Sequence, residues 1–124
     1  MPAPLQISQR AVADVVVLTL NGPLIVDDGD MLFREHVASV VAAGSKHILL
    51  DVRDVTHMDS GGAGALAATL LHVTRRGGCL KLLGPSARVC RVLEITHLRS
   101  IFDVFEVEDE ALRSFDARAR APRS

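Results

Sequence analysis

The feature that most constrains the fold is a short apolar run followed by a glycine-rich turn and a helical repeat. Residues 48–52 read Ile-Leu-Leu-Asp-Val, and residues 58–64 read Met-Asp-Ser-Gly-Gly-Ala-Gly. The next apolar residues return at helical spacing, at Leu66, Leu70 and Val73. A short apolar run bounded by polar residues is typical of a strand covered on both faces, and the later spacing is typical of an amphipathic helix. This strand, loop and helix in series indicate an α/β fold.

The flanking segments continue the alternation of strands and helices. Residues 5–10 and 12–21 predict two paired strands, of which the second ends at Gly22-Pro23. After residue 27 helices and strands alternate, so we expect a mixed, mostly parallel sheet of about five strands with about four helices. The remaining expected elements are a helix that starts at the acids Asp27, Asp28 and Asp30 and ends at Gly44, a strand at 79–83, a helix capped by Ser86, a strand at 103–107 and a helix at 108–119.

Length and composition narrow the classes of protein. The 124 residues fit one domain spanning residues 1–124, with a core at about 5–116 and a frayed tail at 117–124. A net charge of -1 and only 3% aromatic residues argue against a nucleic-acid surface. Because no apolar run is long enough to span a bilayer and the first ten residues lack a signal-peptide pattern, we expect a cytoplasmic protein without membrane insertion.

The turn before the central helix is the expected functional site. Asp59 and Ser60 are residue types that cap helices, and the small residues after them leave the backbone of the first turn uncovered. Each glycine inside a helix costs about 1 kcal/mol relative to Ala, so several together favour a surface that a partner approaches closely. Thr69, His72 and Arg76 are expected on the outward side of the same helix. The predicted partner-binding residues are Thr56, His57, Met58, Asp59, Ser60, Gly61, Gly62, Ala63 and Gly64.

Catalytic and metal-binding interpretations have less support in the sequence. Gly62-x-Gly64-x-x-Ala67 matches a relaxed dinucleotide-binding pattern, but it does not follow a strand directly and no acid stands about 20 residues on. The polar residues Asp51, Asp54, His57 and Asp59 could belong to a metal site, but a polar loop before a helix has the same composition. No nucleophile, base and orienting acid can be assigned. We therefore predict no catalytic residue, metal or cofactor, and no enzyme activity.

The central block resembles a known family. Residues 48–66, Arg76-Gly-Gly78, residues 86–98 and residues 102–112 are similar, in order, to the STAS domain of bacterial anti-sigma factor antagonists. The resemblance implies a small α/β domain that binds a kinase-type anti-sigma factor, a serine kinase with a histidine-kinase-like ATPase fold. In that family the kinase switches the antagonist off by phosphorylating a serine at the start of the second helix.

The resemblance breaks at the residue that would accept the phosphate. The family pattern is Asp-Ser-Ser-Gly-Leu-Gly with the second serine as acceptor, and this chain has Gly61 at that position and Ala63 in place of Leu. Ser60 is the remaining candidate for phosphorylation, although one residue of helix turns a side chain by about 100°. The alternatives are a module that binds its partner constitutively, a STAS subunit of an ABC-type lipid-transport or stress-signalling complex, and a regulator that binds a nucleotide or another small ligand. Ile25, where many family members carry an acid, weakens the last alternative.

Overall fold

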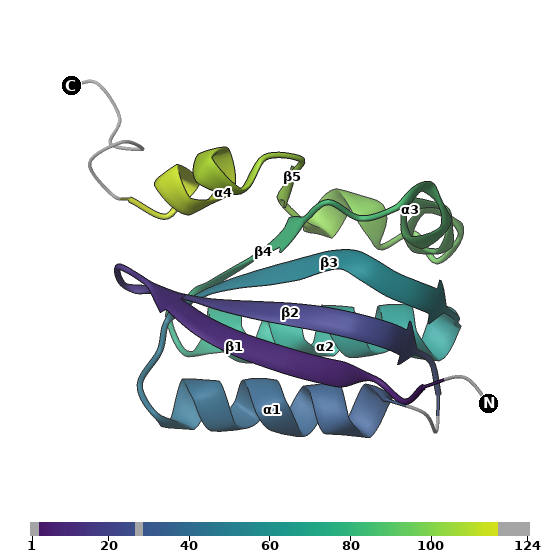
Figure 1. Ribbon diagram of the computed structural model, residues 1–124, viewed down its shortest axis with the longest axis horizontal. Helices are drawn as coiled ribbons and strands as arrows, with labels where there is room; N and C mark the ends of the chain where they lie inside the picture. Colours follow the sequence, from purple (N-terminus) through teal and green to yellow (C-terminus); the bar gives the residue numbers. More distant parts are fainter. Residues whose placement is uncertain (1–2, 27–28, 117–124) are drawn as a thin grey trace.

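A five-stranded sheet forms the centre of the molecule. The computed structural model describes residues 3–26 and 29–116, and its strands are β1 (Gln6–Val12), β2 (Val15–Leu24), β3 (His47–Met58), β4 (Cys79–Leu83) and β5 (Val104–Phe105). They lie in the order β1-β2-β3-β4-β5 (Figure 1). β1 and β2 pair antiparallel, and every later pair is parallel. The predicted mixed, mostly parallel sheet is confirmed.

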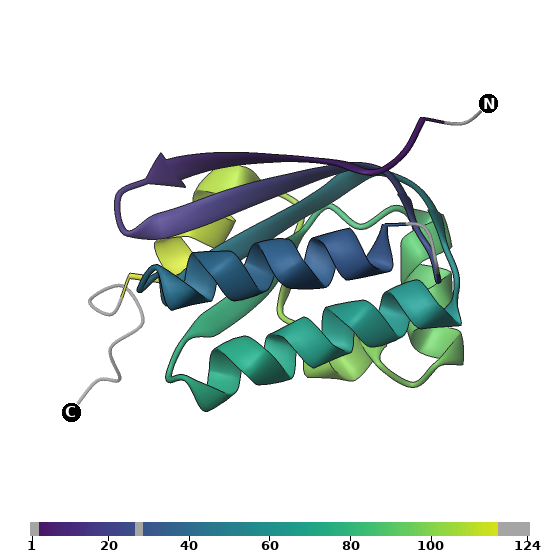
Figure 2. The same ribbon diagram turned by 90° about the horizontal axis from the view of Figure 1, so that it is seen from below.

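Helices cover the two faces of the sheet unequally. The α-helices are α1 (Asp30–Ala42), α2 (Ser60–Arg75), α3 (Ala87–Ile95) and α4 (Glu108–Ser114), with a short 3-10 turn, η1 (Arg99–Ile101), after α3. α1 and α2 lie side by side on one face, whereas α4 packs on the other (Figures 1 and 2). None of the helices in the described ranges is long and apolar enough to cross a membrane.

Side chains that alternate along β3 build two separate cores. Ile48, Leu50 and Val52 belong to the large cluster under α1, α2 and α3, and Leu49 belongs to the smaller cluster under α4. All five residues of the 48–52 run are buried, as expected for a central strand. Because β2, β3 and β4 are parallel, their carboxyl ends lie at one end of the sheet. The helices α1, α2 and α3 begin at that end.

Several predicted boundaries are wrong by a few residues. β2 passes through Gly22-Pro23 and ends at Leu24, with a register shift between Gly22 and Pro23. β1 pairs only as far as Asn21, so the last residues of β2 have one edge without a ladder, where a proline is tolerated. The strand predicted at 103–107 is limited to Val104–Phe105, because it pairs only with Leu82 and Leu83.

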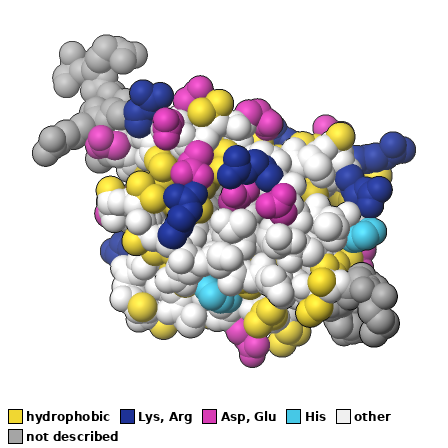
Figure 3. Space-filling view, viewed as in Figure 1, with side chains coloured by type: hydrophobic (Ala, Val, Ile, Leu, Met, Phe, Trp, Pro, Cys, Tyr) yellow, Lys and Arg dark blue, Asp and Glu magenta, His cyan; other side chains and the backbone are white. Residues whose placement is uncertain are grey.

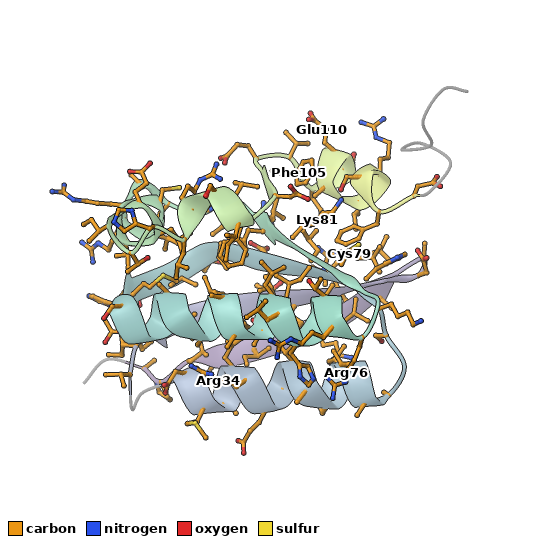
Figure 4. The ribbon with its side chains drawn as sticks, turned by 180° about the vertical axis from the view of Figure 1, so that it is seen from behind. Arg34, Arg76, Cys79, Lys81, Phe105 and Glu110 are labelled. Carbon is orange, nitrogen blue, oxygen red and sulfur yellow. The ribbon has the colours of Figure 1, made fainter. Side chains whose placement is uncertain are left out.

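The ends of the first and last helices also differ from expectation. α1 begins at Asp30 with Gly29 as its N-cap, and the predicted contribution of Asp27 and Asp28 lies outside the described residues. α4 ends at Ser114 rather than Ala119. The buried Lys81 donates from Nζ to the Ser114 carbonyl oxygen at 3.1 Å and to its hydroxyl at 2.9 Å, so a cation occupies the C-terminal end of the helix (Figure 4). Residues 117–119, like the rest of the predicted tail, are outside the described part.

Candidate functional site

Asp59 fastens two segments together at the start of α2. It is the N-cap of the helix, and its Oδ1 accepts a hydrogen bond from the Gly62 N–H at 2.8 Å. The same carboxylate accepts from the backbone N–H of Val26, at 3.2 Å to Oδ1 and 3.1 Å to Oδ2. Asp59 is confirmed as a cap, whereas Ser60 is the first helical residue and caps nothing. One aspartate therefore holds the chain after β2 against the first turn of α2.

Gly62 brings α2 against the protein's own backbone. A Cβ placed on Gly62 would lie 1.8 Å from the carbonyl oxygen of Leu24, the last residue of β2. Real atoms cannot approach so closely, so only glycine permits this packing. The expectation that the glycines leave the whole turn uncovered is wrong at this position, because β2 itself makes the close approach. Ala63 is also buried.

Val26 occupies the space beside Gly61. A Cβ placed on Gly61 would lie 2.8 Å from the Cβ of Val26 and 3.3 Å from Oδ1 of Asp59. The Val26 side chain itself is 54% exposed. Any side chain at position 61 would therefore have to displace an exposed valine that Asp59 holds through its backbone. Sequence reasoning missed Val26, because it lies 33 positions before Asp59 and no local pattern marks it.

The opposite side of the same turn is open. Ser60 is exposed, and a Cβ placed on Gly64 would contact nothing within 4 Å. In the described chain, no protein group accepts the N–H of Ser60 or Gly61. These residues form the open side, which we define as Ser60 and Gly64 with the backbone N–H groups of Ser60 and Gly61. A polar group of a partner could reach free donors at the positive end of α2 here.

The end of β3 extends this surface toward α3. Thr56 and His57 are exposed, whereas Met58 is only 8% exposed and packs into the core. Arg88 at the start of α3 donates from Nη1 to the Thr56 carbonyl oxygen at 3.2 Å. Cationic side chains are visible at the end of the molecule where α3 lies (Figure 3). Arg88 is a second neighbour of the site that sequence reasoning missed.

Comparison with known proteins identifies the family. The chain matches the STAS domain over residues 6–111. The chain belongs to the STAS domain family. A Thermotoga neapolitana protein classed among the anti-sigma factor antagonists is 32% identical over 109 residues, which cover 88% of this chain and 96% of the relative.

Solved structures agree with this assignment. A Thermotoga maritima protein, likewise classed as an anti-sigma factor antagonist, superposes with a TM-score of 0.81 at 29% identity and covers 88% of this chain and 93% of its own. The unphosphorylated anti-sigma factor antagonist SpoIIAA superposes with a TM-score of 0.74 over 96% of this chain and all of its own. At 22% identity that second likeness shows the fold alone.

The acids of this STAS domain that were considered for a metal site lie apart. Asp51 points to the face of the sheet that carries α4 and pairs with Arg53, while Asp54 is exposed and Asp59 is used as a cap. In the described part of the chain, the His57 ring forms a hydrogen bond between Nδ1 and the Thr56 hydroxyl, at 3.2 Å. Among the residues that the structure describes, no three His, Cys, Asp or Glu side chains are placed to hold a metal ion.

Asp51 and Arg53, two residues apart on β3, form a local ion pair. Arg53 donates to Asp51 from Nε at 2.9 Å, from Nη2 at 2.7 Å and from its backbone N–H at 3.1 Å. Burial alone would raise the pKa of Asp51, but the bonds from Arg53 and the charges of Arg53 and Arg10 outweigh burial, and the pKa lies below its usual value. These contacts occupy both oxygens of the Asp51 carboxylate and stabilise its ionised form.

Proposed function

We propose that this STAS domain is a cytoplasmic regulatory module that binds an anti-sigma factor through the open side of α2, in the manner expected of anti-sigma factor antagonists. One observation carries the proposal. Where the family motif begins, at Asp59 and Ser60, the turn is divided into a side closed by β2 and Val26 and a side that presents Ser60 and the free space at Gly64. The full-length similarity to relatives classed as anti-sigma factor antagonists supports the same function.

The partner surface is smaller than the segment predicted from the sequence. Of residues 56–64, the side chains of Met58 and Ala63 face the core and Gly62 is covered by Leu24. The proposed contact residues are therefore Thr56, His57, Ser60 and Gly64, with the exposed edges of Asp59 and Gly61. No residue in this set offers a catalytic constellation, which favours binding over enzyme activity.

Regulation by phosphate at this turn is not part of the proposal. Position 61 has no hydroxyl, and Val26 already fills the space in which a side chain would begin. Ser60 is exposed but points one helical step away, about 100° from the direction of position 61. We infer that the domain binds its partner constitutively, and that a kinase-type partner given ATP adds no phosphate to Ser60.

The direct test measures binding to an anti-sigma factor of the histidine-kinase-like ATPase type from the same genome. Gly64→Arg places a long side chain on the open side without an internal clash, so the dissociation constant should rise at least tenfold while stability is retained. Thr74→Arg, on an exposed position at the far end of α2, is the matched control and should bind as the wild type does.

Two outcomes would count against the proposal. If no such anti-sigma factor binds the full chain, the assignment of partner class is wrong. If one binds and Gly64→Arg leaves its affinity unchanged, the open side is not the contact. Incubation with the partner and ATP followed by mass spectrometry tests the regulatory part, for which we expect an unmodified protein.

A further inference from the structure

A second surface lies between α1 and α2, away from the open side. A groove of about 300 Å³ is lined there by Arg34, Val37, Ala38, Ala68, Thr69 and His72. Such a volume is at the lower end of the range for small-molecule pockets, about 300–1,000 Å³, and this one opens along the seam of two helices. A shape of this kind suits protruding side chains of another protein better than an enclosed small ligand.

The floor and walls of the groove are apolar and small. Val37 is fully buried, and the small side chains of Ala38 and Ala68 line the walls. Thr69 was predicted to face outward, but it is only 4% exposed and its hydroxyl donates to the Leu66 carbonyl oxygen at 2.8 Å. The floor therefore contains no unsatisfied polar group, and apolar side chains can pack on it without cost in hydrogen bonds.

The rim of the groove is cationic. Arg34 lies on α1 and Arg76 at the end of α2, on the same outer face of the two helices (Figure 4). Arg76 donates from Nη1 to Nδ1 of His72 at 3.1 Å, which positions its guanidinium beside the groove. Within residues 3–26 and 29–116, neither arginine has a carboxylate partner.

The surroundings of the groove contain few acids to neutralise these cations. The sequence has no Asp or Glu between Asp59 and Glu94, so the whole of α2 lacks a carboxylate. Glu35 follows Arg34 on α1 but does not line the groove. A partner with carboxylates at both ends of an apolar stripe would complement this surface in charge and in polarity.

We propose that the groove between α1 and α2 docks an acidic amphipathic helix of a partner protein. The apolar stripe of that helix packs over Val37, Ala38 and Ala68, and its Asp or Glu side chains pair with Arg34 at one end and Arg76 at the other. A helix fits because small residues on the walls let it approach the seam of two packed helices. A nucleic acid fits poorly, since its phosphates would face an apolar floor.

The inference stands apart from the proposed function, because no residue of the open side takes part. The experiment selects a displayed library of helical peptides, with randomised outward positions, against the full chain. The enriched peptides are expected to carry Asp or Glu on both sides of an apolar stripe. Their dissociation constants, measured by fluorescence anisotropy, should rise at least tenfold for Arg34→Glu/Arg76→Glu.

The control variant is Arg91→Glu/Arg113→Glu, which makes the same change in charge at exposed positions on α3 and α4. It should bind the peptides as the wild type does, and circular dichroism should show all three proteins folded. The proposal is overturned if the selection yields no peptides, basic peptides, or peptides whose binding ignores Arg34 and Arg76.

Two other occupants are separate outcomes that also overturn it. If the wild type self-associates in sedimentation velocity and Arg34→Glu/Arg76→Glu abolishes the association, a second copy of the chain fills the groove. If a single-stranded oligonucleotide binds and the same variant releases it, the cations serve a nucleic acid.

Discussion

The start of α2 and the surface beside α4 make their contacts by opposite means. At the start of α2, glycine lets two backbones touch, and a Cβ on Gly62 would lie 1.8 Å from the Leu24 carbonyl oxygen. On the face that carries α4, the core is an apolar cluster that includes Leu49 and Phe115, and charged side chains form ion pairs at its surface, where Asp51 pairs with Arg53 and Arg10 pairs with Glu108. Two backbones in contact cannot move to accommodate an added side chain. Partly exposed ion pairs between long side chains can change conformation and replace their partner by water.

This difference separates structural from functional explanations of the glycine-rich turn. Its three glycines lie within four residues, yet Gly62 serves internal packing, Gly61 faces Val26, and only Gly64 borders free space. A glycine that packs against the protein's own chain does not indicate a surface for a partner. The open side, and not the glycine content, therefore indicates a docking surface.

The largest effect is expected at the backbone contact. Gly62→Ala should lower the free energy of unfolding by about 3 kcal/mol or more, because the added Cβ forces Leu24 and the start of α2 apart. Urea denaturation of the purified domain at pH 7 measures the loss. Failure to accumulate as folded protein in the cell would be the extreme form of the same result.

Gly64→Ala is the matched control within the same turn. Its Cβ meets nothing within 4 Å, so alanine should be neutral or should stabilise the domain by up to about 1 kcal/mol through its higher helix propensity. If both substitutions cost the same, the contact between Gly62 and Leu24 would not be what distinguishes the two positions.

A smaller effect is expected at the ion pair on the other face. Asp51→Asn keeps the shape of the side chain and removes the charge that accepts three bonds from Arg53. Because Arg53 is half exposed, the expected loss is about 1–2 kcal/mol at pH 7. Denaturation of both proteins at a series of pH values measures it.

The pH dependence of that loss follows from the direction of the pKa shift. The pKa of Asp51 is lower in the folded state than in the unfolded chain, where it is about 3.9, so its stabilising contribution is complete above that value. As the pH falls through the folded-state pKa, the carboxylate takes up a proton and the contribution is lost. The difference between wild type and Asp51→Asn should therefore shrink below about pH 4, and a difference that grows there would reverse the assigned sign.

Most of the fold was predictable from local patterns in the sequence. The division of the glycine-rich turn into a side closed by β2 and Val26 and an open side was not. The run at 48–52, the cap at Asp59 and the cap at Ser86 depend on neighbours in the sequence, and the structure confirms all three. The end of β2 and the length of α4 depend instead on pairing with β1 and on Lys81, which no local pattern records. The same holds for Val26, whose contact with the start of α2 joins residues 33 positions apart.

The smallest effect tests whether Val26 and position 61 are coupled. Gly61→Ser alone should destabilise the domain by about 1 kcal/mol, because its Cβ would lie 2.8 Å from that of Val26. Val26→Ala would not relieve this contact, since alanine keeps the Cβ. Val26→Gly removes it, so in that background Gly61→Ser should cost nothing or stabilise the helix.

The measurement is a double-mutant cycle by urea denaturation, with an expected coupling of about 1 kcal/mol between the two positions. If the effects of the two substitutions on the free energy of unfolding add within about 0.3 kcal/mol, the chain after β2 moves aside freely. Val26 then does not restrict the side chain at position 61. A coupled pair has a consequence for regulation. Once a partner kinase is in hand, only Val26→Gly/Gly61→Ser, and not Gly61→Ser alone, should take up phosphate at position 61, because only that variant has room for the hydroxyl beside residue 26.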